Sequence, residues 1–233
     1  MRKYDVVYFL KPDFINNELR YSLRSIEANM THGKVWFVGG QPNELFPDER
    51  MPLVQKGKTK WEKVRGMLRA VCENDDISKK FWLFNDDFFV LEKMTSEKAL
   101  FNGTLRDHIL HIEHRYNDRP TGYTKQLRAC ERLLKEAGLP TFNYAIHVPM
   151  LIDRKKMLEA LDTFPTCPMF RSIYGNYAEV GGNNHKDVKI VGMNHVMEGD
   201  WDFVSTEDMS FDYGAVGAQL KRIFPEPCKY ETE

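Results

Sequence analysis

The chain has 233 residues, 42% of them hydrophobic, which suffices for one ordinary domain with a sizeable core. Its 33 Lys and Arg residues nearly balance its 34 Asp and Glu residues, so the basic excess of a protein that relies on nucleic-acid phosphates is missing. No apolar run approaches the roughly 20 residues of a membrane span, and the four scattered cysteines include no C-x-x-C pair for zinc or redox chemistry. The chain opens without a secretory signal pattern. We expect one cytoplasmic domain without a membrane span.

The first part of the chain alternates strand patterns with helix patterns. Continuous apolar runs, typical of strands buried on both faces, occupy 5–10, 34–38 and 81–84, with shorter candidates at 52–55 and 88–91. Apolar residues at helical spacing predict amphipathic helices over 17–29 and 58–72. This order predicts an α/β fold with a doubly wound, mostly parallel sheet flanked by helices.

The second part of the chain is less regular. A helix pattern over 124–137 ends at Gly138, and a strand pattern at 147–152 precedes a short helix pattern at 154–161. The segment 164–199 is rich in Pro, Gly and Asn, which is typical of loops, and only 188–192 resembles a strand. Loops that a rigid sheet positions commonly carry specificity.

The most informative motif is the acidic turn of Asn85, Asp86 and Asp87, called the 85–87 turn below. It stands between two apolar strand patterns, and ligands of open parallel sheets bind beyond the carboxyl ends of strands. Two carboxylates at a strand end repel each other, so they favour a hard cation such as Mn²⁺ or Mg²⁺, with diphosphate oxygens completing its shell. The alternative is a solvated Asp-rich turn, but its place between buried strands favours a site.

Three segments resemble the conserved core of the Stealth family, namely 18–27, 34–38 with the following Gln-Pro, and 84–89. Stealth proteins are sugar-1-phosphate transferases of capsular polysaccharide synthesis. The acidic motif also resembles the D-x-D element of GT-A glycosyltransferases, whose nucleotide-sugar-binding half is a doubly wound sheet. The resemblance implies that residues 1–95 bind a UDP- or GDP-linked sugar and that residues 96–233 form the acceptor side of the same domain. It also implies that Asp87 is a metal ligand, with Asn85 and Asp86 binding substrate.

Basic and polar side chains near the strand ends are predicted to bind the donor. Arg20 and Arg24 lie four residues apart on the first predicted helix, so both guanidinium groups can match phosphate oxygens, the alternative being a solvated helix face. In the loop after the first strand, Asp13 is predicted to accept hydrogen bonds from the base or ribose, beside Lys11. Lys63 belongs to a basic cluster that is predicted to touch a diphosphate or a polyanionic acceptor.

Further candidates in the second half follow from the resemblance. The segment that contains His147 is similar to the His-containing third block of Stealth proteins, which makes His147 a base or a phosphate ligand. Arg171 lies in a segment similar to a family block in which an Arg neutralises a phosphate. A C-terminal His often completes the GT-A metal site, so His195 is predicted to bind metal with Asp87, and His185 competes with it.

The sequence as a whole predicts a metal-dependent glycosyltransferase that moves a sugar from a nucleotide donor to an acceptor hydroxyl. Inverting transfer needs a carboxylate base, for which Asp153, Glu179 and Asp208 are candidates. One alternative is a Stealth-type sugar-1-phosphate transferase, although Stealth proteins usually have an Asp-Gly-Ser-like turn after the first strand, where this chain has Lys-Pro-Asp. Another is a non-catalytic nucleotide-sugar or glycan binding module. The acceptor stays open between a glycan, a protein and a hydroxylated DNA base, which the near-neutral charge disfavours.

Overall fold

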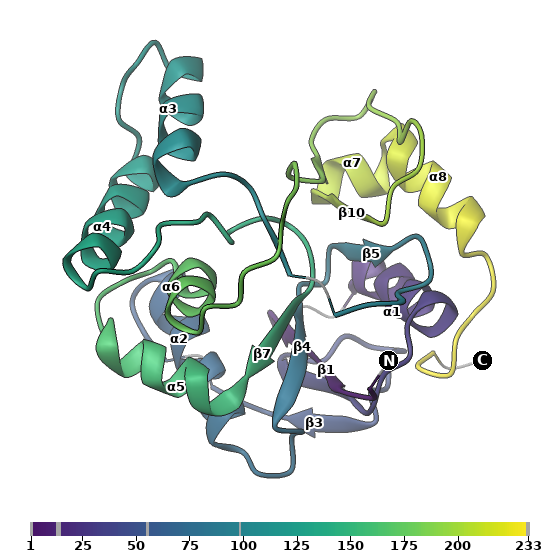
Figure 1. Ribbon diagram of the computed structural model, residues 1–233. Helices are drawn as coiled ribbons and strands as arrows, with labels where there is room; N and C mark the ends of the chain where they lie inside the picture. The colour runs from purple at the N-terminus through teal and green to yellow at the C-terminus, as the bar shows by residue number, and fades with distance from the viewer. Residues whose placement is uncertain (1, 13–14, 55, 98, 232–233) are drawn as a thin grey trace.

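A five-stranded sheet forms the centre of the computed structural model, which describes residues 2–12, 15–54, 56–97 and 99–231. Its strand order is β3-β2-β1-β4-β7, with β1, β2, β3 and β4 parallel and β7 antiparallel to β4 (Figure 1). The five strands are β1 (Asp5–Leu10), β2 (Val35–Gly39), β3 (Glu49–Met51), β4 (Lys80–Phe84) and β7 (Met150–Asp153). The predicted mostly parallel sheet is therefore confirmed. The third strand lies at 49–51 instead of 52–55; residue 55 is outside the described residues.

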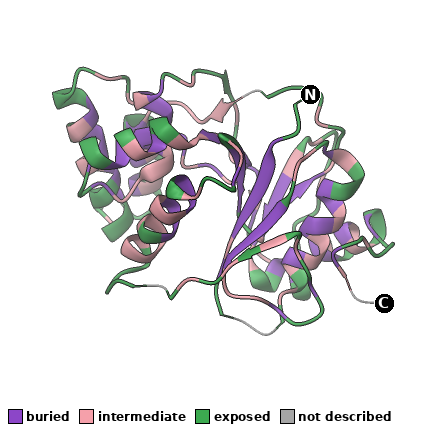
Figure 2. Cartoon of the chain, turned by 90° about the horizontal axis from the view of Figure 1, so that it is seen from below, coloured by how far each residue is buried: buried purple, intermediate pink, exposed green. Residues whose placement is uncertain are grey.

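Helices cover both faces of this sheet, which explains why its central strands read as unbroken apolar runs (Figure 2). Side chains of α1 pack on one face with Val6 and Tyr8, whereas those of α2, α4, α5 and α6 pack on the other face with Val7. The bounds of these helices and of the neighbouring α3 are α1 (Asn17–Asn29), α2 (Lys60–Glu73), α3 (Leu105–Arg115), α4 (Gly122–Glu136), α5 (Arg154–Thr163) and α6 (Phe170–Tyr177). The result is a doubly wound arrangement.

Helix α6 falls in the segment that the composition assigned to loops, so that prediction is wrong at 170–177. Phe170, Ile173, Tyr174 and Tyr177 stand at helical spacing and belong to the main hydrophobic core. Burial of this apolar stripe outweighs the helix-weakening Gly and Asn residues of the segment.

A second, three-stranded sheet continues directly from the first through the 85–87 turn. Its order is β5-β10-β9, where β5 is Phe88–Val90, β9 is Lys189–Ile190 and β10 is Phe203–Thr206. The helices α7 (Asp208–Asp212) and α8 (Ala215–Ile223) pack against it through a separate apolar cluster. A short pair, β6 (Leu100–Phe101) with β8 (Asn183–Asn184), completes the strands of the described residues. No helix in the described part of the chain combines the length and the apolar character that spanning a membrane requires.

The C-terminal segment is held against α1 by an ion-pair cluster centred on Glu231. Arg24 donates from Nε to Oε1 at 2.7 Å and from Nη2 to Oε2 at 2.8 Å, and Arg20 donates from Nη1 to Oε2 at 2.8 Å. Arg24 also donates to the carbonyls of Phe224 and Pro225. Burial of Glu231 alone would raise its pKa, but hydrogen bonds from Arg24, the Cys228 amide and Arg20 lower the pKa to about 2.

Replacing Glu231 with glutamine is expected to lower the free energy of unfolding at neutral pH by about 2 kcal/mol, because charge-assisted bonds to two arginines are lost. The folded-state pKa of about 2 lies below the ordinary value of 4.5, so this stabilisation is complete above pH 4.5 and disappears as pH falls towards 2. Urea unfolding at neutral and acidic pH measures it. The exposed Glu226→Gln is the matched control, and equal stability of both variants at neutral pH would contradict the role of Glu231.

Candidate active site

The carboxyl edge of the central sheet brings the start of α1 against the 85–87 turn. Strands β1 and β4 are parallel neighbours, so the segment after β1 and the turn after β4 meet at the same edge. Asn16 caps α1, with its Oδ1 accepting from the Leu19 amide at 2.8 Å, and donates from Nδ2 to Asp86 Oδ2 at 2.7 Å. The cap that starts α1 therefore also holds one carboxylate of the turn.

Asp87 is the buried centre of the turn, with 8% of the residue exposed. Its Oδ2 accepts from Lys189 Nζ at 2.7 Å and from Ser205 Oγ at 2.8 Å. Both donors belong to the small sheet, in which Ser205 pairs with Phe88 on one side and with Lys189 on the other. The predicted metal ligand thus holds an ammonium group and a hydroxyl group in this structure.

Glu18, in the first turn of α1, adds a further carboxyl group beside the turn. Its Oε1 accepts from Thr206 Oγ1 at 2.5 Å. Desolvation, reinforced by the charges of Asp87, Asp86 and Asp208, raises the pKa of Glu18 to about 8 despite the Thr206 hydrogen bond. Glu18 is therefore largely protonated at neutral pH.

Asp86 and Asp208 join the same acidic cluster in different ways. Desolvation and the charge of Asp87 raise the pKa of Asp86, against the opposing hydrogen bond from Asn16 and the charge of Lys11. Asp208 is exposed at the start of α7 and acts on Glu18 through its charge. The structure thus brings together four of the predicted site residues, namely Lys11, Asp86, Asp87 and Asp208.

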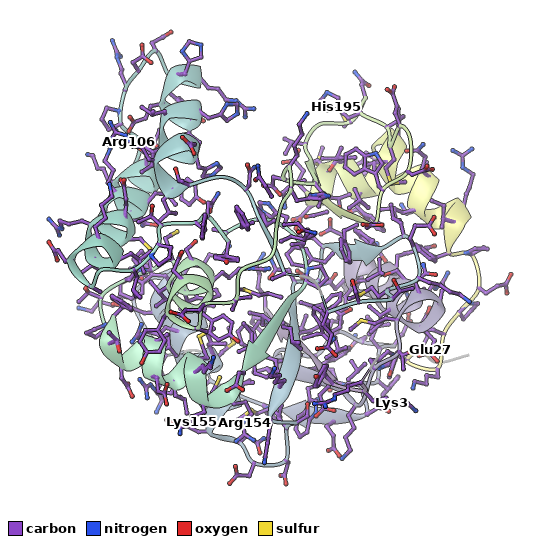
Figure 3. The ribbon with its side chains drawn as sticks, in the orientation of Figure 1. Lys3, Glu27, Arg106, Arg154, Lys155 and His195 are labelled. Carbon is purple, nitrogen blue, oxygen red and sulfur yellow. The ribbon has the colours of Figure 1, made fainter. Side chains whose placement is uncertain are left out.

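The described residues form no preassembled three-ligand site for Mn²⁺ or Mg²⁺, and the predicted metal stays a prediction. Within residues 2–12, 15–54, 56–97 and 99–231, no three His, Cys, Asp or Glu side chains are grouped so that they could hold a metal ion. His195, the predicted partner of Asp87, is exposed at the periphery on the loop between β9 and β10 (Figure 3), with Nδ1 2.5 Å from the Val191 carbonyl oxygen. Asp13 lies outside the described residues.

A histidine–aspartate pair lies beside Phe88, the residue after Asp87. His147 Nδ1 lies 2.8 Å from Asp187 Oδ2, and the His147 amide donates to Asp187 Oδ1 at 3.0 Å. The His147 ring meets the Phe88 ring edge-on, with centroids 6.4 Å apart. Burial alone would raise the pKa of Asp187, but the hydrogen bond and charge of His147 lower it. A carboxylate that accepts from Nδ1–H leaves Nε2 able to accept a proton from a bound hydroxyl.

Arg171 lies over the same Phe88 ring, with its Cζ 5.6 Å from the ring centroid. It donates from Nη2 to the Val148 carbonyl, whereas its Nε is buried without a hydrogen-bond partner among the described residues. Burial lowers the pKa of Arg171 to about 10, and the charges of Asp187 and Asp87 partly offset this effect. The guanidinium group therefore stays charged at neutral pH between the two halves of the site.

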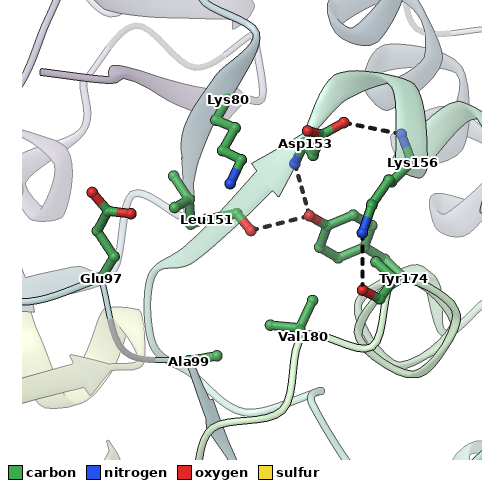
Figure 4. Close-up of a pocket in the computed structure, with 9 residues that line it drawn as sticks. Lys80, Glu97, Ala99, Leu151, Asp153, Lys156, Tyr174 and Val180 are labelled. Atoms are coloured by element: carbon green, nitrogen blue, oxygen red, sulfur yellow. Dashed lines mark hydrogen bonds between the residues drawn. The ribbon is translucent and has the colours of Figure 1, made fainter. Parts of the chain in front are cut away.

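The structure corrects the prediction that Asp153 acts as the base at the 85–87 turn. Strand β7 runs antiparallel to β4, and Asp153, the last residue of β7, pairs with Lys80, the first residue of β4. Asp153 therefore lies at the opposite end of β4 from the 85–87 turn. Its Oδ1 accepts from the Lys156 amide at 3.1 Å and caps α5. There it lines a separate cavity of about 250 Å³ with Tyr174, whose hydroxyl meets the Asp153 amide at 2.7 Å (Figure 4).

The contacts of four other predicted residues, Arg20, Arg24, Lys63 and Asn85, do not test their predicted roles in substrate binding. Arg20 and Arg24 bind Glu231, so their contacts assign them a structural role, and substrate binding stays a prediction. Lys63 is half-buried in the first turn of α2, and Asn85 is exposed in the turn, its carbonyl accepting from the Phe88 amide at 3.3 Å.

Sequence reasoning missed the side chains that contact the turn, Glu18 beside it with its partner Thr206, and the partner of His147: Asn16, Lys189, Ser205, Glu18, Thr206 and Asp187. One signal was present in the sequence. Lys189 interrupts an apolar strand pattern between Val188 and Ile190, and a charge in such a strand needs a partner.

Replacing Glu18 with glutamine is expected to flatten the pH dependence of stability. The carboxyl group ionises near 4.5 in the unfolded chain and near 8 in the folded one, so the free energy of unfolding of the parent falls as pH rises between these values. The fall is about 1 kcal/mol per pH unit, and glutamine removes it. Urea unfolding across this range measures the slope, with the exposed Glu92→Gln as the control; an unchanged slope in the Glu18 variant would refute the assignment.

No protein family model and no curated protein matches the sequence, so the resemblance to the Stealth family is not confirmed. Among solved structures, the galactosyltransferase LgtC, in complex with donor and acceptor sugar analogues, aligns over 97% of this chain and 96% of its own, with 12% identity and a TM-score of 0.51. GlyE, a glycosyltransferase of Streptococcus pneumoniae, aligns over 97% of this chain and 52% of its own, with 12% identity and a TM-score of 0.38. Mouse xyloside xylosyltransferase 1 aligns over 99% and 96%, with 11% identity and a TM-score of 0.37. The likeness to LgtC shows that this chain has the fold of a GT-A glycosyltransferase, with a mostly parallel sheet between helices.

Proposed function

We propose that this chain is a glycosyltransferase that moves a sugar from a nucleotide-sugar donor to an acceptor hydroxyl. The observation that carries the proposal is the placement of the His147–Asp187 pair and of the Asp87–Lys189 pair beside Phe88, next to the turn that leaves the carboxyl end of β4. LgtC, whose fold this chain shares, is a galactosyltransferase that binds donor and acceptor sugar analogues, which supports the same class of reaction here.

The donor side of the proposed site is the 85–87 turn with Lys11 and the start of α1. Lys11 and Lys189 supply positive charge beside it, and the N-terminus of α1 directs its first amides to the same edge. These groups suit the diphosphate of a UDP- or GDP-linked sugar. A Mn²⁺ or Mg²⁺ ion that bound Asp87 through Oδ2 would have to displace Lys189, and we derive no step through it.

The acceptor side is the His147–Asp187 pair with Arg171. His147 Nε2 takes the proton of the acceptor hydroxyl while the acceptor oxygen forms its bond to the anomeric carbon of the sugar. The bond from that carbon to the diphosphate oxygen breaks, and its electron pair stays on the diphosphate. Asp187 holds the His147 ring and stabilises the imidazolium that forms.

The reaction class is tested by incubating the protein with UDP- and GDP-sugars and a panel of glycan, protein and hydroxylated-DNA acceptors. We expect release of a nucleoside diphosphate that depends on the acceptor. Release of a nucleoside monophosphate would instead identify sugar-1-phosphate transfer, and nucleotide binding without turnover of any donor would identify a binding module.

In the same assay, His147→Gln is expected to lower kcat by about 100-fold to 10,000-fold, because glutamine keeps a donor for Asp187 but cannot accept the proton. Binding of the donor should stay as in the parent. The control is His114→Gln at the exposed end of α3. A kcat equal to that of the control would exclude His147 as the base.

A further inference from the structure

Lys189 is brought to the 85–87 turn by strand pairing across the small sheet. Its strand β9 pairs with β10, and β10 pairs with β5, so Lys189, Ser205 and Phe88 stand in register on adjacent strands. Asp87 immediately precedes Phe88 and receives the ammonium at 2.7 Å. The lysine is therefore fixed at the turn by the fold of the second half of the chain.

The ammonium group of Lys189 retains donors that it can offer to a ligand. An ammonium carries three N–H donors, and Asp87 Oδ2 is its one hydrogen-bond partner among the described residues. The Lys189 side chain is 25% exposed, whereas that of Asp87 is 12% exposed, so the cation is the more accessible member of the pair. Asp87 orients the lysine, and part of the lysine side chain is open to solvent.

Three carboxyl groups near Lys189 have hydrogen-bond partners within the chain, and that of Asp87 is also paired with a charge. Asp87 accepts hydrogen bonds from Lys189 and Ser205. Asp86 accepts one from Asn16, and Glu18 accepts one from Thr206. A metal ion that bound Asp87 Oδ2 would have to displace both the ammonium and the hydroxyl. Separating one partner from a buried ion pair leaves an uncompensated charge and is strongly unfavourable.

We propose that Lys189, positioned by Asp87, binds the diphosphate of the donor and takes the place of a divalent metal ion in this site. The inference rests on the proposed function. Lys189 donates to a diphosphate oxygen and stabilises the charge that this group gains when its bond to the anomeric carbon breaks; the acceptor proton leaves to His147 as described above. Asp87 is then a positioning residue instead of a metal ligand, and the ammonium requires no recruitment from solution.

The test is the binding of UDP and of GDP to the full chain by calorimetry, in EDTA and in Mn²⁺. We expect the parent to bind one of them with the same Kd in both conditions. Lys189→Met should weaken binding by about 10-fold to 100-fold, the range for a charge-assisted hydrogen bond to phosphate. Lys186→Met, an exposed lysine on the same connection, is the matched control and should bind as the parent does.

Two further variants separate a folding defect from a binding defect. Lys189→Met leaves the buried Asp87 carboxylate without its cation, so the double variant with Asp87→Asn removes both charges and should keep the parent melting temperature while binding remains weak. Asp87→Asn alone keeps the ammonium but removes the charge that positions it, so we expect nucleoside diphosphate binding in EDTA to weaken, although less than in Lys189→Met.

Three outcomes would overturn the inference. Binding that EDTA abolishes and Mn²⁺ restores, with Lys189→Met equal to the parent, would assign the diphosphate to a metal ion and leave the glycosyltransferase proposal intact. Parent-like binding by the folded double variant would show that Lys189 does not contact the diphosphate. Failure of both UDP and GDP to bind in either condition would remove the proposed function together with the inference.

Discussion

The ion pair of Asp87 with Lys189 connects the two sheets of this protein. Asp87 ends the turn that leaves β4, and Lys189 and Ser205 reach it from the small sheet. A buried carboxylate is stable only when it is paired and hydrogen-bonded, so the turn and the small sheet must form together. The small sheet in turn supports α7 and α8 through their shared apolar cluster. One compensated charge thus joins the central sheet to the C-terminal third of the chain.

Phe88 gives the site its second constraint, because its backbone and ring serve different parts of the site. Its backbone pairs with Ser205 in the small sheet, and its ring lies against both Arg171 and His147. The apolar ring lies beside the turn, where it lowers the local dielectric around the charges. Burial explains why Glu18 holds its proton at neutral pH, and it also strengthens the His147–Asp187 interaction. The electrostatics of the site therefore depend on burial as well as on the pairing of its charges.

The sequence predicted those parts of the fold that depend on local pattern. Unbroken apolar runs identified β1, β2 and β4, and the acidic motif was placed correctly in the turn between β4 and β5, while its role as the focus of a site stays a prediction. The failures concern long-range pairing. The antiparallel direction of β7 places Asp153 at the wrong end of β4 for catalysis at the turn, and no local pattern encodes that direction. Lys189 is separated from Asp87 by 102 positions, so only the register of two further strand pairings brings them together.

The same long-range pairing explains how a turn rich in carboxylates can receive an anion. Alone, the acids of the turn would repel a diphosphate. Protonation of Glu18 removes one negative charge, and the ammonium of Lys189 compensates that of Asp87. Lys11 and Arg171 then add positive charge near the remaining acids. An acidic motif at a strand end consequently does not by itself specify a metal ion, because a cation supplied by another strand satisfies the same electrostatic requirement and leaves the carboxylate to orient it.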